Sequence, residues 1–311
     1  MRVAWCFPGQ GSQFVGMGKD LAAQFASARR VFERADHALG ESLSALCFEG
    51  PEPDLRLTRN TQPAILATSI AALEALRERV PGLAPPVAAA GHSLGEYSAL
   101  VASGALALED AVRLVRVRGA AMQEAVPEGE GAMAAVIGMP AEVLADVCQE
   151  ASQGEVVTAA NFNAPGQIVI AGHAAAVDRA CKLVGQRKGK AIPLKVSAPF
   201  HCSLMAPAAS RLRPELEALS VSALSFPVIA NVDAAPNTDA GRVKGLLLRQ
   251  IDHPVRWEET LAHMAAVGVT HILEIGPGKV LAGLTRYITK AIQVLPVGSI
   301  EGIEAAANLL G

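Results

Sequence analysis

The sequence predicts an α/β protein in which a mainly parallel sheet is covered by helices and carries a smaller inserted subdomain. Short, wholly apolar runs alternate with longer segments of helical period, a pattern typical of parallel sheets that are buried on both faces. Residues 132–196 instead hold six elements in close succession. The length of 311 residues exceeds the usual size of one domain, which leaves room for such an insertion.

The strands of the main sheet are predicted from five apolar runs, each short enough to be a buried strand. These runs are Val3 to Phe7, Val87 to Ala90, Val228 to Ala230, His271 to Ile275 and Val294 to Val297. Between the first two runs, segment 21–39 has apolar residues spaced alternately four and three apart, which forms one stripe of an amphipathic helix. Segment 66–76 repeats this pattern before the second strand.

The insertion is predicted from the order of its elements, βαββαβ, which is the ferredoxin-like arrangement. Its strands are expected at 132–138, 156–161, 167–171 and 191–196, with helices at 140–151 and 174–186 and a turn at 163–166. We therefore divide the chain into a large subdomain, 1–131 and 197–311, and a small one, 132–196, which forms one side of a cleft.

The composition excludes several classes of protein. With 51% hydrophobic and 18% charged residues the chain is not disordered, and its apolar runs fall short of the roughly 20 residues of a membrane-spanning helix. The net charge of −3 gives no general attraction to nucleic acid or to anionic membranes. Five dispersed cysteines form neither a zinc motif nor a disulfide framework. We therefore expect a cytoplasmic protein that binds no metal.

The most specific chemical signal is Gly91-His92-Ser93-Leu94-Gly95, which follows a predicted strand and precedes residues of helical spacing. This is the GxSxG pattern in the strand-turn-helix context of a nucleophile elbow. The turn would expose the Ser93 hydroxyl at a helix N-terminus, where the Leu94 main-chain N–H can stabilise an oxyanion. The alternative is that Ser93 only caps the helix.

A nucleophilic serine needs a base, and His201 is the histidine with the most suggestive position. It follows a proline turn at the end of the insertion's last predicted strand, where the chain re-enters the main domain. The other histidines lie among ordinary helix or loop residues, except His92, whose side chain should point away from that of Ser93. The choice among them depends on geometry. No aspartate is evident as the third member of a triad.

The glycine-rich segment 7–13 follows the first strand, where a phosphate-binding loop would lie. It matches neither GxxxxGK[ST] nor GxGxxG, which disfavours nucleotide binding. We expect instead that this loop brings main-chain N–H groups and an amide side chain toward Ser93, because α/β acyl-transfer enzymes take a second oxyanion donor from a loop after another strand.

Arg118 gives the clue to the substrate. In the helix predicted over about 108–126, this position falls on the apolar face. A buried guanidinium is costly unless an anion meets it, and its planar fork suits a carboxylate. That carboxylate belongs either to the substrate or to an internal Asp or Glu, and the sequence leaves both open.

Several segments taken together carry a family resemblance. They are FPGQGSQ, GHSLGEYSAL, RVRGAAMQEAVPEGEGAMAAV, NFNAPGQIVIAG, APFHCSLM, HPVRW and EIGPGKVL, in order from about residue 3 to residue 297. Their joint occurrence resembles the malonyl-CoA:acyl carrier protein transacylases, the FabD family, and the related acyltransferase domains of polyketide synthases. The resemblance implies an α/β-hydrolase-like core with a ferredoxin-like insertion, and no cofactor besides the substrates malonyl-CoA and holo-acyl carrier protein.

The resemblance also implies roles for single residues. Ser93 would be the acylated nucleophile and His201 its general base, oriented by the main-chain carbonyl of Gln250 in place of an acidic group. Gln10 and Leu94 would form the oxyanion hole. The implied reaction is a ping-pong transfer of the malonyl group from coenzyme A to the phosphopantetheine thiol of acyl carrier protein.

Two further residues would select the acyl group. Arg118 would form a bidentate pair with the free carboxylate of the malonyl group. Phe200 is similar to the bulky residue that malonyl-selective polyketide acyltransferases carry before the histidine, and its ring would leave little room for an α-methyl group.

A basic stretch is the candidate docking surface for the carrier protein, since carrier proteins are typically acidic. Segment 179–195 contains no acid and holds Arg179, Lys182, Arg187, Lys188, Lys190 and Lys195, to which Lys279, Arg286 and Lys290 could add. The alternative is an ordinary solvated basic face.

Other functions remain open at this point. An esterase or thioesterase would use the same elbow, but its apolar acyl pocket does not call for Arg118. A binding or scaffold protein would not depend on Ser93. The sequence does not choose between fatty-acid, polyketide and malonate-decarboxylase enzymes, and nothing in it demands more than a monomer.

Overall fold

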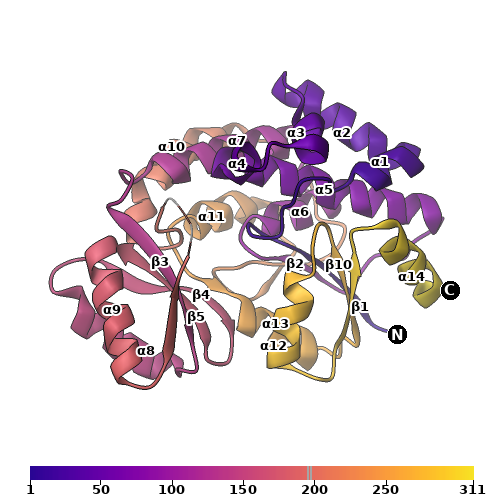
Figure 1. Ribbon diagram of the computed structural model, residues 1–311. Coiled ribbons are helices and arrows are strands. Elements are labelled where there is room, and N and C mark those ends of the chain that lie inside the picture. Colours follow the sequence, from indigo (N-terminus) through magenta and orange to yellow (C-terminus); the bar gives the residue numbers. More distant parts are fainter. Residues whose placement is uncertain (195, 197) are drawn as a thin grey trace.

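The computed structural model describes residues 1–194, 196 and 198–311, which form two sheets with helices packed around them (Figure 1). The strands are β1 (Val3–Phe7), β2 (Ala89–Gly91), β3 (Gly131–Ile137), β4 (Val157–Ala164), β5 (Gln167–His173), β6 (Lys190–Pro193), β7 (Val228–Ile229), β8 (Pro236–Asn237), β9 (Val255–Arg256), β10 (His271–Ile275) and β11 (Gln293–Val297). The helices are α1 (Lys19–Gln24), α2 (Ala26–Leu39), α3 (Leu43–Glu49), α4 (Glu52–Arg56), α5 (Thr58–Arg79), α6 (Gly95–Ala102), α7 (Leu108–Glu124), α8 (Ala141–Ser152), α9 (Ala174–Gln186), α10 (Ala206–Ala218), α11 (Ala240–Gln250), α12 (Trp257–Ala266), α13 (Val280–Ile288) and α14 (Ile300–Leu310), with a 3-10 turn η1 (Ser203–Met205).

The main sheet has the strand order β11-β10-β1-β2-β7-β8, and each neighbouring pair is parallel except β7 with β8. The prediction of a mainly parallel sheet is therefore confirmed. The antiparallel edge strand β8 was not predicted, because two residues beginning with proline show no apolar run.

The two faces of the main sheet bury different cores. In β1, Trp5 and Phe7 join one hydrophobic cluster, while Ala4 and Cys6 join another that includes Trp257 of α12. This alternation is the consequence of a strand whose successive side chains point to opposite faces. Both faces are therefore covered, as the wholly apolar runs predicted.

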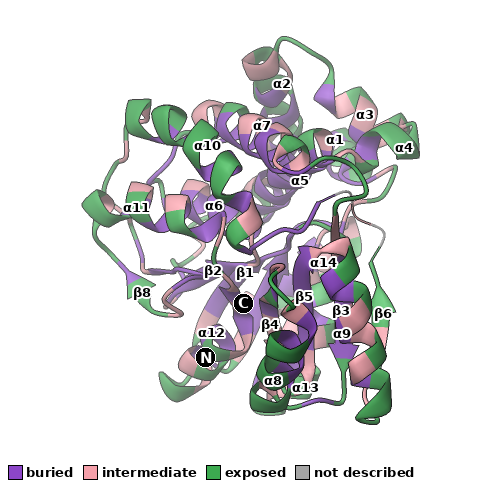
Figure 2. Ribbon diagram, turned by 90° about the vertical axis from the view of Figure 1, so that its left-hand side faces the viewer, coloured by how far each residue is buried: buried purple, intermediate pink, exposed green. Residues whose placement is uncertain are grey.

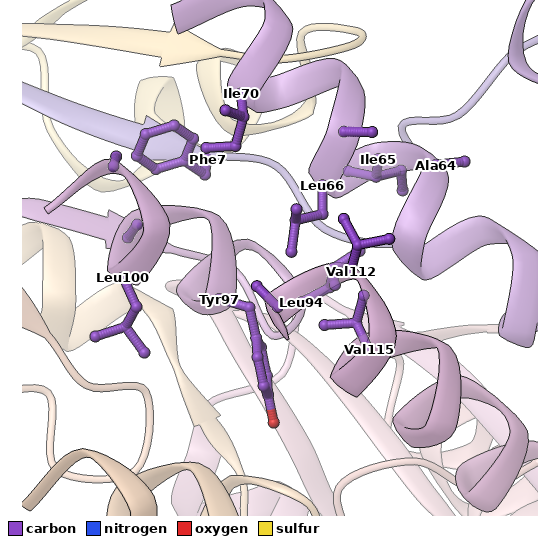
Figure 3. Close-up of a cluster of buried hydrophobic side chains, with 14 of the residues drawn as sticks. Phe7, Ala64, Ile65, Leu66, Ile70, Leu94, Tyr97, Leu100, Val112 and Val115 are labelled. Carbon is purple, nitrogen blue, oxygen red and sulfur yellow. The ribbon is translucent and has the colours of Figure 1, made fainter. Parts of the chain in front are cut away.

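Helix α5 forms the centre of the larger core. It lies between the main sheet and the outer helices, and buried residues occupy nearly its whole length (Figure 2). Figure 3 shows Leu66 and Ile70 of this helix near Phe7 of β1 and Leu94 at the start of α6. Burying each of these large side chains contributes about 1.5–3 kcal/mol. The packing holds α6, and with it the Ser93 turn, against the end of β1.

The small sheet has the strand order β6-β3-β5-β4-β9. The first four strands pair antiparallel, and α8 and α9 cover one face through a separate hydrophobic cluster. Strand β9 pairs parallel with β4 but comes from the C-terminal part of the chain, so this sheet extends beyond segment 132–196.

Two predicted boundaries in the small sheet need correction. The turn expected at 163–166 is only Pro165-Gly166, because β4 continues to Ala164, which pairs with Gln167. Gly166 has φ +67°, a conformation that glycine adopts without strain. Strand β6 ends at Pro193, whereas the prediction ran to Val196, and Lys195 lies outside the described residues.

Among the described residues no helix is both long and apolar enough to cross a membrane.

Candidate active site

Ser93 lies at the turn between β2 and α6, in a backbone conformation that only the neighbouring glycines permit. A Cβ on Gly91 would come within 1.8 Å of the main-chain carbon of Gly95, and one on Gly95 within 2.1 Å of the Phe7 carbonyl oxygen. Ser93 itself has φ +50°, a strained value for a residue with a side chain. The two glycines of GxSxG are therefore required by close backbone approach, and the serine projects from the turn.

Ser93 and His201 form a hydrogen-bonded pair. The Ser93 Oγ lies 2.8 Å from the His201 Nε2, and the His201 Nδ1 lies 2.9 Å from the main-chain oxygen of Gln250. Because a carbonyl oxygen can only accept, Nδ1 carries the proton and Nε2 is free to accept from the serine hydroxyl. This is the arrangement of a nucleophile, a base and a group that orients the base.

The surroundings keep the imidazole neutral. Burial lowers the pKa of His201 to about 3, with a further contribution from the positive charge of Arg118. His201 is 3% exposed and has φ +61°, so both members of the pair hold left-handed backbone conformations. Such strain is found at sites where a side chain must be aimed.

Arg118 is the most deeply buried arginine of the site, with 1% of its surface exposed. Its Nη2 donates to the Ser93 Oγ at 3.1 Å and to the Gln250 Oε1 at 2.9 Å, while its buried Nε has no hydrogen-bond partner among the described residues. Its guanidinium lies 5.2 Å from the centre of the Tyr97 ring. Burial lowers its pKa, although a guanidinium stays charged at any physiological pH. No described carboxylate forms an ion pair with it.

Glu96 and Asn231 belong to the same network, and the sequence analysis missed both. The Glu96 Oε2 accepts from the Gln250 Nε2 at 2.6 Å and from the Asn231 main-chain N–H at 3.0 Å. The Asn231 side chain accepts from the Ser93 main-chain N–H at 2.7 Å. Burial raises the pKa of Glu96 to about 7. The signal that could have revealed Glu96 is that it is the only charged residue of α6, a helix that is buried on nearly all sides.

The two residues expected to bind an oxyanion lie beside Ser93. Leu94 is buried, and its main-chain N–H forms no hydrogen bond with a described residue. Gln10 is exposed at the rim, where its Nε2 donates to the Thr58 Oγ1 at 3.3 Å. Both line the same cavity as Ser93.

That cavity has a volume of about 330 Å³ and lies between the two sheets. The predicted residues Gln10, Ser93, Leu94, Arg118, Phe200 and His201 all line it, while Gln250 lies behind them.

Strands of the small sheet contribute Met133, Asn161 and Asn163, and α13 contributes Leu281 and Leu284. The His92 Nε2 lies 2.8 Å from the Asn163 Oδ1, which joins the elbow to β4. The described residues contain no cluster of His, Cys, Asp or Glu that could hold a metal.

The fold and the geometry around Ser93 define an acyl-transfer enzyme, and comparisons identify its family. Residues 4–299 match the acyl transferase domain family. A malonyl CoA-acyl carrier protein transacylase of Bacillus subtilis is 50% identical over 311 residues, which cover 99% of this chain and 97% of that protein. The crystal structure of an acyl carrier protein S-malonyltransferase from Vibrio cholerae superimposes with a TM-score of 0.95 at 47% identity, covering 98% and 100% of the two chains.

A third relative was solved with a partner. It is a malonyl-transacylase in complex with its type II polyketide synthase acyl carrier protein, with a TM-score of 0.96, 44% identity and coverage of 99% and 100% of the two chains. The chain therefore belongs to the acyl transferase domain family, and within it to the malonyl CoA-acyl carrier protein transacylases.

Proposed function

We propose that this protein transfers a malonyl group from malonyl-CoA to the phosphopantetheine thiol of an acyl carrier protein, through an ester on Ser93. The product supplies the extender unit of fatty acid or polyketide synthesis. The observation that carries the proposal is the convergence of Ser93, His201 and Arg118 on one cavity: a nucleophile, its base, and a buried cation with no carboxylate partner among the described residues.

The first half-reaction makes the ester. The Ser93 oxygen attacks the thioester carbonyl while the His201 Nε2 takes the hydroxyl proton. The carbonyl oxygen becomes negatively charged and is stabilised by the Leu94 main-chain N–H and the side-chain amide of Gln10. The intermediate then breaks the carbon–sulfur bond, and His201 returns the proton to the sulfur of the departing coenzyme A.

The second half-reaction uses the same groups in reverse order. His201 removes the proton from the phosphopantetheine thiol, whose sulfur attacks the ester carbonyl. The carbon–oxygen bond to Ser93 breaks, and the serine oxygen takes the proton back from His201. The carbonyl of Gln250 keeps the imidazole in the tautomer that both steps need.

Two residues select the acyl group in this proposal. Arg118 binds the free carboxylate of the malonyl group, which supplies the anion that the guanidinium otherwise lacks. Phe200 is 8% exposed and lines the cavity directly before His201, so its ring limits the space for a branched acyl group.

The finer description of the fold is also a proposal. We infer that the large subdomain, 1–131 and 197–311, has an α/β-hydrolase-like core and that 132–196 is a ferredoxin-like subdomain. The order β6-β3-β5-β4 with antiparallel pairing supports the second part, and the β2-Ser93-α6 turn supports the first.

The carrier protein would dock at the mouth of the cavity. Of the cations predicted to receive it, Arg179, Lys182 and Arg187 form ion pairs with Glu155, Asp178 and Glu150. Lys188 and Lys190 form none with described residues, and neither do Lys279, Arg286 and Lys290 at the ends of α13. Because Leu281 and Leu284 of α13 line the cavity, we place the main docking contact on the α13 side.

Charge reversal tests this docking surface. We expect Lys279→Glu with Arg286→Glu to raise the KM for an acidic carrier protein about tenfold while leaving the rate of serine acylation unchanged. The matched control is Lys182→Glu, which removes a cation already paired with Asp178. Equal effects of the two changes would contradict the assignment of α13.

Intact mass measurement after incubation with malonyl-CoA tests the reaction itself. We expect a malonyl adduct on the wild-type chain that Ser93→Ala abolishes and that holo-acyl carrier protein discharges. A persistent absence of adduct, with rapid release of malonate, would instead indicate a hydrolase.

A further inference from the structure

We propose that Glu96 is a positioning residue that acts on Arg118 through the side-chain amide of Gln250. The proposal rests on the proposed function, because it concerns how Arg118 is held ready for the malonyl carboxylate. Glu96 does not line the cavity, as Ser93 and Arg118 do, and it is 2% exposed.

The side-chain amide of Gln250 lies between Arg118 and Glu96, with its oxygen toward the first and its nitrogen toward the second. Its Oε1 accepts from the Arg118 Nη2 at 2.9 Å. Its Nε2 donates to the Glu96 Oε2 at 2.6 Å and to the main-chain oxygen of Ser93 at 3.0 Å. The guanidinium, the amide and the carboxylate therefore form one chain of hydrogen bonds.

Glu96 fixes which end of the amide faces Arg118. The Glu96 Oε2 and the Ser93 carbonyl both act as acceptors here, so both require the amide nitrogen on their side. A rotated amide would set its oxygen against these two acceptors and its nitrogen against the guanidinium, which only donates. Without the carboxylate, only the Ser93 carbonyl and the more distant Asn231 Oδ1, which accepts from the Gln250 Nε2 at 3.4 Å, would hold the orientation.

The indirect contact leaves the guanidinium free for a ligand. A carboxylate paired directly with Arg118 would occupy the fork that a substrate carboxylate needs. Glu96 instead stabilises the buried positive charge from behind the amide, and the Arg118 Nε stays without a partner among the described residues. The free enzyme thus holds a compensated cation whose Nε donor is still open.

Glu96 is also connected to the Ser93 turn through Asn231. A test must therefore separate its effect on Ser93 from its effect on Arg118. Its Oε2 accepts from the Asn231 main-chain N–H, and the Asn231 side chain accepts from the Ser93 main-chain N–H and donates to the Gly91 carbonyl. A disturbance through Asn231 would slow transfer of every acyl group. A disturbance through Gln250 and Arg118 would slow only the transfer of groups that carry a carboxylate.

The experiment compares kcat/KM for malonyl-CoA with that for acetyl-CoA. We expect Glu96→Leu to lower the malonyl-to-acetyl ratio at least about tenfold, and Glu96→Gln, which keeps an acceptor oxygen, to stay within about threefold of the wild type. Gln250→Leu removes the amide but keeps the carbonyl that binds His201. In that background, Glu96→Leu should change the ratio by less than about threefold, because the connection is already broken.

Two results would overturn the proposal: an equal loss of both activities in Glu96→Leu, or the same change of ratio with and without the Gln250 amide. If Glu96→Leu does not melt cooperatively, Glu96→Asp replaces it, since its carboxylate is one methylene too short to reach the amide. A ratio in Glu96→Asp that equals the wild type's would then overturn the proposal. Failure of the wild type to form a malonyl adduct would instead overturn the proposed function.

Discussion

The two sides of the cavity differ in how completely their side chains are satisfied. On the side of Ser93 and His201, the hydroxyl and both ring nitrogens have partners at 2.8–2.9 Å. On the side of Arg118, the Nε is buried without a partner among the described residues, and so is the Oε1 of Gln62, a residue of α5 that also lines the cavity. If Arg118 binds the malonyl carboxylate as proposed, the reacting groups are organised before substrate arrives, whereas the guanidinium is completed by the ligand.

The largest expected effect comes from the reacting side. We expect His201→Ala to lower the rate of serine acylation by malonyl-CoA and by acetyl-CoA alike, each at least about a thousandfold, because both reactions need the same base. Rapid-mixing measurements of adduct formation would check this. Wild-type rates with either donor would show that His201 is not the base.

Arg118→Ala should act on one acyl group only. We expect malonyl transfer to fall about a hundredfold, since a buried charged contact to the substrate is lost, while acetyl transfer is retained or rises. The matched control is Arg113→Ala on the same helix, whose guanidinium is exposed and paired with Asp110. Equal losses for both acyl groups would mean that Arg118 is structural, and the difference between the two sides would disappear.

The sequence predicted the residues that line the cavity better than the network behind them. Ser93 was found because GxSxG followed an apolar strand, and Arg118 because a cation fell on an apolar helix face. Both signals are local. Glu96 was overlooked because an acid in the first turn of a helix is ordinarily solvent-exposed and favourable there.

Other parts of the site depended on contacts between distant segments. Ser93 and Asn231 are separated by 138 positions, and only the order of strands β2 and β7 in the sheet brings them together. Strand β9 could not be predicted either, because two residues carry no periodicity and their partner strand β4 lies far away in the sequence. The ion pairs of Arg179 with Glu155 and of Arg187 with Glu150 likewise required the packing of two segments, whereas the pair of Lys182 with Asp178 is local to helix α9.

Phe200→Ser should have a smaller effect on the recognising side. Because the ring lines the cavity before His201, we expect its loss to raise the ratio of methylmalonyl to malonyl transfer about tenfold, the usual magnitude for one methyl group in an apolar pocket. Competition between the two thioesters, read as the mass of the acylated chain, measures this ratio. A ratio that does not change would place the α-carbon of the acyl group away from Phe200.

The smallest expected effect joins the two sides, because Arg118, the cation proposed to recognise the substrate, also lowers the pKa of His201, the proposed base. Burial, and after it the charge of Arg118, lowers the pKa of His201 to about 3, so the imidazole stays unprotonated well below its ordinary titration near pH 6.5. We therefore expect kcat/KM for acetyl-CoA to vary less than about twofold between pH 8 and pH 5. In Arg118→Ala the pKa of His201 rises, and the rate should begin to fall at a higher pH than in the wild type.

Titration of Glu96 could also change kcat/KM between pH 8 and pH 5, because burial raises its pKa to about 7. The measurement is therefore repeated in Glu96→Gln, which cannot titrate at that position. If Glu96 acts on the elbow through ionisation, a limb near pH 7 should vanish in this variant, while the limb that belongs to His201 stays. The kcat/KM for acetyl-CoA could instead halve near pH 6.5 in the wild type, in Arg118→Ala and in Glu96→Gln alike. This result would show that the base titrates as a solvated histidine whose pKa Arg118 does not change.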